Sequence, residues 1–161
     1  MKRVIGVLVE NKFGVLAHVS GLFSARGFNI ASLAVGETED PTVSRITIVV
    51  EGDERTLEQI KKQLNKLIDV IKIFDLTNKD FIDRELILIK VKITAKNRRD
   101  VIKIIETVGG VVSNVNSETL TVEAAGDQNK INTLIELLRP FGIKEIVRTG
   151  RIAVAVEGKK K

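Results

Sequence analysis

With 161 residues, 43% of them hydrophobic, the chain is long enough to form one or two small packed domains. It has no cysteine and one histidine, which excludes disulfides, thiolate zinc sites and a cysteine nucleophile, and part of its net charge of +5 comes from the three C-terminal lysines. No stretch approaches the ~20 continuous apolar residues of a membrane helix, and the N-terminus has no signal-peptide pattern, so we expect a cytoplasmic protein.

The N-terminal stretch is predicted to form a strand over about residues 3–10, a short loop from Asn11 to Gly14, and an amphipathic helix over about residues 14–25. The helix is indicated by apolar residues at helical spacing, namely Val15, Leu16, Val19, Leu22 and Phe23. Gly27 stands where a left-handed cap residue is expected, and Phe28 would then contact Phe23 in a Schellman arrangement.

The start of this helix has the features of a small-molecule site. The first turn of a helix leaves about four backbone N–H groups unpaired and has roughly half a positive charge, so it favours a carboxylate or phosphate. Because Gly14 has no Cβ, a ligand could approach the backbone closely beside Asn11. We interpret the stretch as a sensor of a small molecule rather than as an active site.

The rest of the first half continues the pattern with strands over about residues 29–37 and 43–51, a helix over about 53–66 and a strand over about 69–76. In the third strand Ile46, Ile48 and Val50 alternate with Arg45, Thr47 and Val49, which predicts one buried and one half-exposed face. Asp53 is the expected N-cap of the second helix. The order of elements is βαββαβ.

The polar segment 77–83 is predicted to separate two units, after which the pattern restarts. The second half is expected to contain strands over about 85–93, 111–116, 119–125, 143–149 and 151–156, and helices that begin near Asn97 and after Asp127. The fold class is therefore α+β, with two tandem ferredoxin-like domains over residues 1–77 and 84–158.

The repeat differs at the loop that precedes its first helix. Residues 94–100, Thr-Ala-Lys-Asn-Arg-Arg-Asp, contain no glycine, so the candidate ligand loop occurs once. The cluster of Lys96, Arg98 and Arg99 could bind an anion or a partner, although a solvated helix start is the preferred interpretation. His18 is expected to be an ordinary surface residue.

The combination of loop, helix, Gly27-Phe28-Asn29-Ile30 and βαββαβ order resembles the ACT domain, a module that binds amino acids at domain interfaces. The segments LVENKFGVLAHVSGLFSARGFNIASLAVG, DPTVSRITIVV and EQIKKQLNKLIDVIKI resemble the small regulatory subunit of acetohydroxyacid synthase, also called acetolactate synthase. The similarity extends through the second domain to Gly150-Arg151-Ile152-Ala153.

This resemblance implies a non-catalytic regulatory subunit in branched-chain amino-acid biosynthesis, which activates a catalytic large subunit and confers feedback inhibition by valine or a related amino acid. It implies an effector site of Asn11, Gly14, Val15 and Leu16, which would meet the polar end of the amino acid, with Asn29 and Ile30 from the neighbouring chain of a homodimer or larger assembly. It implies no cofactor or metal in this chain, and thiamine diphosphate, Mg and FAD in the catalytic partner. Ala34 and Gly36 are smaller than the residues expected there, which bears on effector preference.

Two other classes of function fit parts of the pattern. An RNA-binding module shares the βαββαβ order and a basic charge, but the strand Ser44 to Val49 has none of the aromatic residues on which RNA bases stack. An amino-acid-metabolic enzyme with this fold would need an acid/base pair or a cofactor loop, and the sequence has no pattern for either. Nucleic acid and membrane are therefore not among the expected partners.

Overall fold

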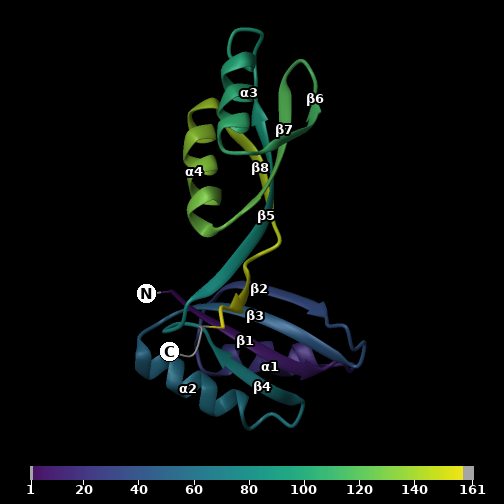
Figure 1. Cartoon of the computed structure of the whole chain (residues 1–161), viewed down its shortest axis with the longest axis vertical. Coiled ribbons are helices and arrows are strands. Elements are labelled where there is room, and N and C mark those ends of the chain that lie inside the picture. The colour runs from purple at the N-terminus through teal and green to yellow at the C-terminus, as the bar shows by residue number, and fades with distance from the viewer. Residues whose placement is uncertain (1, 158–161) are drawn as a thin grey trace. The chain divides into compact units, whose positions relative to one another are not determined.

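The computed structural model describes residues 2–157, in which two βαββαβ repeats are followed by one further strand (Figure 1). The first repeat consists of β1 Lys2–Glu10, α1 Val15–Ala25, β2 Ile30–Glu37, β3 Val43–Glu51, α2 Glu54–Leu64 and β4 Val70–Asp75. The second consists of β5 Phe81–Lys92, α3 Arg98–Thr107, β6 Val111–Val115, β7 Thr119–Gly126, α4 Gln128–Leu138, the 3-10 turn Arg139–Phe141 and β8 Ile143–Arg148, and the last strand is β9 Ile152–Ala155. The predicted α+β fold class is confirmed.

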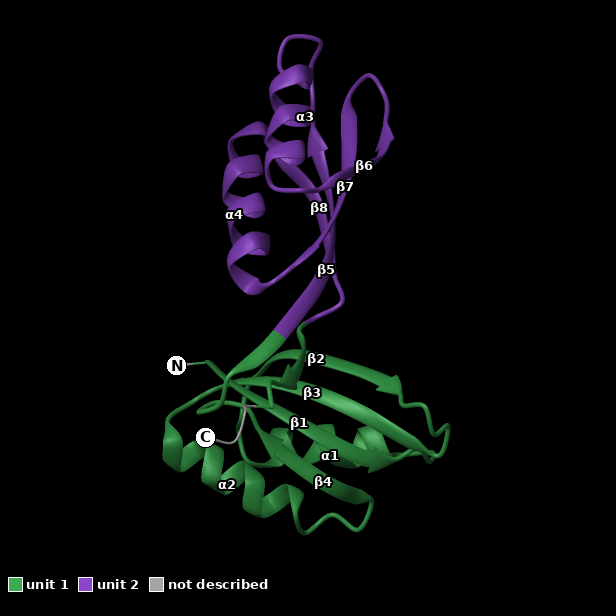
Figure 2. Ribbon diagram, in the orientation of Figure 1, with its two compact units in different colours: residues 1–82, 151–161 green, residues 83–150 purple. Residues whose placement is uncertain are grey.

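The chain divides into two compact units, residues 1–82 with 151–161 and residues 83–150 (Figure 2). The expected domain limits, 1–77 and 84–158, differ from this division because β9 belongs to the first unit; residue 158 lies outside the described residues. The division falls within segment 77–83, and β5 begins inside that segment, at Phe81. Apolar Phe81 packs into a small core, and Val156 N–H donates to Asp80 O at 2.8 Å, so contacts distant in sequence extend the strand.

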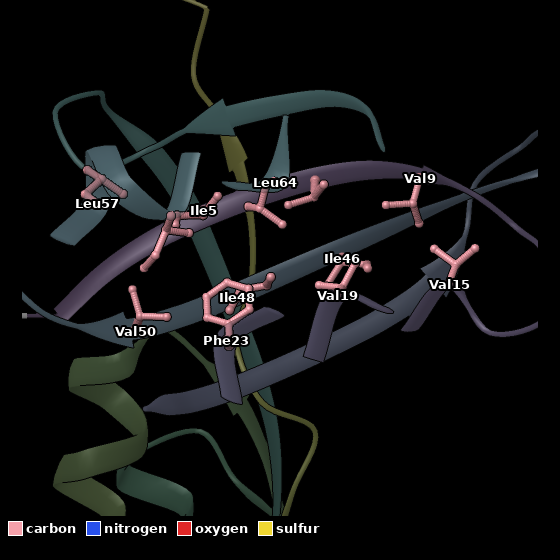
Figure 3. Packing of buried hydrophobic residues seen from close by; sticks show 12 residues of the cluster. Ile5, Val9, Val15, Val19, Phe23, Ile46, Ile48, Val50, Leu57 and Leu64 are labelled. Atoms are coloured by element: carbon pink, nitrogen blue, oxygen red, sulfur yellow. The ribbon is translucent and has the colours of Figure 1, made fainter. Parts of the chain in front are cut away.

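In the first unit the antiparallel sheet has the order β2-β3-β1-β4. The β1–β3 register pairs Ile5 with Ile48 and Val7 with Ile46, so alternate residues of both strands face α1 and α2. Figure 3 shows this core, whose fully packed members are Ile5, Val7, Val9, Val15, Val19, Phe23, Ile46, Ile48, Val50, Leu57, Ile60 and Leu64. Aliphatic residues dominate it, with Phe23 as the largest side chain.

The opposite face of this sheet is more covered than the sequence predicts. Thr47 and Val49 are each 2% exposed, so the prediction of a half-exposed face is wrong for these two residues. A second small core lies on this side and consists of Val4, Val49 and Leu76 with Phe74, Phe81, Ala153 and Ala155. The Arg45 guanidinium lies 4.2 Å from the centre of the Phe74 ring and 3.5 Å from Ala153 O, so it joins the sheet to β9.

The helix ends of the first unit follow the local sequence signals. Gly27 has a left-handed φ of 70°, Gly27 N–H donates to Ser24 O at 3.1 Å, and Phe28 N–H donates to Phe23 O at 3.0 Å. The Phe23 and Phe28 rings meet edge to face with centroids 6.4 Å apart, which confirms the predicted Schellman arrangement. Asp53 caps α2 as predicted, because its side chain accepts the N–H of Thr56 at 2.8 Å.

The second unit repeats this architecture. Its antiparallel strands follow the order β6-β7-β5-β8, the counterpart of the first sheet. Residues of α3 and α4 pack on one face around a core that includes Ile87, Ile89, Val91, Val101, Ile105, Leu120, Val122, Ile131, Leu134 and Leu138. Asp127 caps α4 as predicted, accepting Lys130 N–H at 2.8 Å. None of the helices in the described part of the chain has the length and hydropathy that a membrane crossing needs.

Candidate effector site

Asn11 begins the loop between β1 and α1 and is fastened to the turn between β2 and β3. Its backbone N–H donates to Thr42 O at 2.7 Å. Its side-chain Nδ2 donates to Pro41 O at 2.8 Å and to Glu37 Oε1 at 3.1 Å. One bond reaches the last residue of β2 and two reach the turn that follows it, so the side chain of this exposed loop residue has a defined position.

Gly14 is the N-cap of α1 and leaves the first turn of the helix open. Its φ of 83° is left-handed, a conformation in which glycine has no steric penalty, and a Cβ built there would have no neighbour within 4 Å. No side chain caps α1, and its first turn contains no acidic residue. The start of α1 therefore has neither a side-chain acceptor nor a negative charge of its own, which favours an anionic ligand group such as a carboxylate.

Val15 and Leu16 differ in what they can offer a ligand. Val15 is 4% exposed and packs into the core, so only its backbone remains, with its N–H 3.4 Å from Lys12 O. Leu16 is 44% exposed and can present an apolar side chain. The predicted residues Asn11, Gly14, Val15 and Leu16 thus form one continuous edge of the molecule at the start of α1.

Asn29 and Ile30 lie at the other end of α1. Asn29 is exposed, whereas Ile30 is partly buried against the core and pairs with Val50 of β3. The eleven residues of α1 at a rise of ~1.5 Å each separate its ends by roughly 16 Å, more than a small amino acid spans. Within one chain the structure does not bring Asn29 and Ile30 to Asn11, and their contribution from a neighbouring chain stays a prediction.

Glu37, Pro41 and Thr42 contact Asn11 and were not among the predicted site residues. Asp40 shapes the turn between β2 and β3, because its Oδ1 accepts the N–H of Thr42 at 2.9 Å and the Thr42 hydroxyl at 2.7 Å. These hydrogen bonds, first the hydroxyl and then the amide, lower the pKa of the Asp40 carboxyl below its ordinary value. The Asp-Pro-Thr order is a local signal of such a turn, but no local pattern indicates that the turn touches Asn11.

A surface depression of about 490 Å³ lies beside this contact. It is lined by Glu10, Asn11, Lys12, Pro41, Thr42, Val43 and Ile71. Lys12 Nζ lies 2.5 Å from Glu10 Oε2, and this hydrogen bond raises the pKa of the Lys12 ammonium. The Lys12 ammonium thus already has an anionic partner, whereas the first turn of α1 has no acidic residue and no side-chain cap.

The other residues singled out in the sequence are not part of the site around Asn11 and the start of α1. His18 is exposed on α1, as predicted, and its Nδ1 lies 3.2 Å from Asp69 Oδ2. Lys96, Arg98 and Arg99 are exposed at the start of α3, as a solvated helix start predicts. Among residues 2–157 no three His, Cys, Asp or Glu side chains gather in a group that could hold a metal ion.

Comparisons with known proteins assign both halves of the chain to one family. Residues 5–72 match the family model of the AHAS small subunit-like ACT domain, and residues 84–157 match that of the small subunit of acetolactate synthase. The chain is 47% identical over 161 residues to a probable acetolactate synthase small subunit of Archaeoglobus fulgidus, covering 100% of both chains. It is 49% identical over 156 residues to the acetolactate synthase small subunit of Bacillus subtilis, covering 96% of this chain and 91% of the relative.

A solved structure supports the same assignment. The crystal structure of the acetolactate synthase small subunit from Thermotoga maritima superposes with a TM-score of 0.88 at 36% identity, and the match covers 99% of each chain. Both units of the present fold are therefore found together in a protein of that description. The chain belongs to the family of acetolactate synthase small subunits, and its first unit is an ACT domain.

Proposed function

We propose that this protein is a non-catalytic regulatory subunit that activates the catalytic large subunit of acetolactate synthase and confers feedback inhibition by valine or a related branched-chain amino acid. The observation that carries the proposal is the uncapped start of α1 beside the fixed side chain of Asn11, within an ACT domain. Thiamine diphosphate, Mg and FAD would be bound by the catalytic partner. The assembly would work in the cytoplasm.

An amino acid matches the charges at this site. Its carboxylate would accept hydrogen bonds from the backbone N–H groups of Leu16 and its neighbours in the first turn of α1, where the helix dipole favours an anion. Its apolar side chain would lie near Leu16, which is 44% exposed. Valine, leucine and isoleucine all satisfy these requirements, and valine is our first choice of effector.

A second copy of the chain would complete the site. Asn29 and Ile30 lie at the far end of α1, so a single ligand would meet them together with Asn11 only across two chains. β2 is an edge of the first sheet, and its residues Ile30–Gly36 contain no charge and no proline. Such an edge has unpaired backbone groups and favours pairing with another strand. We therefore propose a homodimer, or a larger assembly built from it.

The second unit would support assembly or contact the catalytic subunit rather than bind an effector. Its corresponding loop contains no glycine and is closed by Thr94 and Asn97. An RNA-binding role is less favoured, because RRM domains stack bases on aromatic residues of an open sheet face. In the first unit that face is occupied by β9, and its Phe74 ring already contacts Arg45.

The test is reconstitution of the full-length protein with its catalytic large subunit. We expect the small subunit to raise acetolactate synthase activity, and valine to lower the activity of the complex but not that of the large subunit alone. Calorimetric titration of the small subunit with valine, leucine and isoleucine should give at least one saturable isotherm. A complex that is activated but insensitive to all three amino acids, with no binding heat, would contradict the proposed effector.

A further inference from the structure

The side chain of Asn11 has a defined orientation, although it lies in an exposed loop. Its Nδ2 donates to a backbone carbonyl, Pro41 O at 2.8 Å, and to a carboxylate, Glu37 Oε1 at 3.1 Å. An amide nitrogen and an amide oxygen are assigned from their partners, and here both partners only accept. The reversed amide would place Oδ1 against two oxygens. The nitrogen therefore faces the turn, and Oδ1 is the atom that remains for a ligand.

The turn that holds Asn11 is stabilised by its own side chains. Asp40 Oδ1 accepts both the N–H and the hydroxyl of Thr42, and Thr38 N–H donates to Val43 O at 2.9 Å. The hydrogen bonds from Thr42 lower the pKa of the Asp40 carboxyl, so they favour the ionised form that accepts them. The turn thus presents Pro41 O and Thr42 O to Asn11 in fixed positions.

The free Oδ1 of Asn11 needs a donor from its ligand. In residues 2–157 it accepts no hydrogen bond, and an amide oxygen binds N–H or O–H groups only. A zwitterionic amino acid has one such group besides its side chain, the α-ammonium. The negative charge of Glu37 stands 3.1 Å from Nδ2 of the same amide and also favours a cation there, while the start of α1 favours the carboxylate.

We propose that Glu37 and the turn over residues 38–42 position Asn11 so that its Oδ1 accepts a hydrogen bond from the α-ammonium of the effector. The inference rests on the proposed function, because it assumes that an amino acid binds at this loop. Glu37 is a positioning residue that acts through Asn11. The site then discriminates amino acids from carboxylic acids of the same carbon skeleton, which have the carboxylate and the apolar branch but no amine.

The experiment compares valine with its deamino analogue 3-methylbutanoate on the full-length protein by calorimetry, with competition where the analogue binds weakly. The variants are Glu37→Ala, which removes the acceptor, and Glu37→Gln, whose side-chain oxygen can still accept from Asn11. Glu39→Ala is the matched control, because Glu39 is an exposed carboxylate two residues away and makes no contact with Asn11 among the hydrogen bonds of the described residues. Thermal unfolding of each variant monitors the fold.

We expect wild type to bind valine at least tenfold more tightly than 3-methylbutanoate. Glu37→Ala should weaken valine binding by about threefold to tenfold, the size expected for one hydrogen bond, and leave the analogue within twofold. Glu37→Gln should recover most of the loss, and Glu39→Ala should match wild type. Equal losses for both ligands, or none for either, would overturn the inference and leave the proposed function intact. A wild-type protein that binds neither ligand would overturn both.

Discussion

The two units have the same element order and the same sheet order, yet the loops that enter their first helices differ. In the second unit, Thr94 N–H donates to Asn97 Oδ1 at 2.7 Å and Asn97 N–H donates to Thr94 Oγ1 at 3.3 Å, so the loop satisfies its own polar groups. Asp100 lies in the first turn of α3. In the first unit Gly14 offers no side chain, and the first turn of α1 has no acid.

The shared fold does not require an uncapped helix start, so the start of α1 is a feature of the site. A helix start is stabilised by a side-chain acceptor or a nearby negative charge, and three of the four helices in residues 2–157 have at least one of these. Only α1 has neither, and its loop is fastened elsewhere, through Asn11. The stabilisation that α1 lacks from its own sequence is what a ligand carboxylate would supply.

The largest effect should come from closing the open helix start. Gly14→Asp places a carboxylate where the effector carboxylate would bind, and like charges ~4 Å apart repel by about 1 to 4 kcal/mol, so valine affinity should fall by roughly fivefold to several hundredfold. Gly14→Asn is the matched control, since it imposes a similar left-handed backbone cost without the charge. Calorimetry with valine measures both variants, and equal loss in the two would assign the effect to backbone strain.

A second prediction concerns the contacts of Arg45 on the face of the first sheet that β9 covers. A Cβ at Gly6 would lie within 2.1 Å of Arg45 Nη2, so Gly6→Ala should displace the guanidinium from Phe74 and Ala153 and lower the free energy of unfolding by about 1 to 2 kcal/mol. Gly36→Ala is the control, because a Cβ there would have no neighbour within 4 Å. Urea unfolding gives the values, and similar midpoints for both variants would refute the role of Arg45 at β9.

Removal of a helix cap in the second unit should change stability without changing regulation. Asp127→Ala loses the acceptor for Lys130 N–H and should lower the free energy of unfolding by about 1 kcal/mol. Asp127→Asn keeps an acceptor and should lose little. Valine affinity should stay at the wild-type value in both variants, measured by calorimetry, and a clear fall would mean that the second unit takes part in effector binding.

The smallest expected effect is on the thermal stability at low pH. Hydrogen bonds from the amide and hydroxyl of Thr56 lower the pKa of Asp53 in the folded protein, so its contribution to stability is complete above the ordinary carboxyl pKa of ~3.9 and is lost as the pH falls through the lowered value. Asp53→Asn keeps a capping acceptor but cannot titrate. Between pH 5 and 3 the melting temperature should fall slightly less for this variant than for wild type, and a steeper fall would contradict the assignment.

Much of the fold follows from local sequence signals. Gly27 and Phe28 identify the end of α1, and Asp53 and Asp127 identify helix starts, because each acts on groups within a few residues. The open start of α1 was predictable for the same reason. The attachment of Asn11 to Glu37 was not, since 26 residues separate them and only the folded sheet brings them together. The burial of Val49 and the position of β9 likewise depend on a small core with Ala153 and Phe81, distant in sequence.

The claim that the effector binds at the start of α1 is tested most directly by NMR of the amide-labelled full-length protein during titration with valine. We expect the amide resonances of Gly14, Val15, Leu16 and Ala17 to shift in proportion to site occupancy, while those of Arg98, Arg99 and Asp100, at the same place in the second unit, stay unchanged. Shifts at the start of α3 without shifts at the start of α1 would contradict the account.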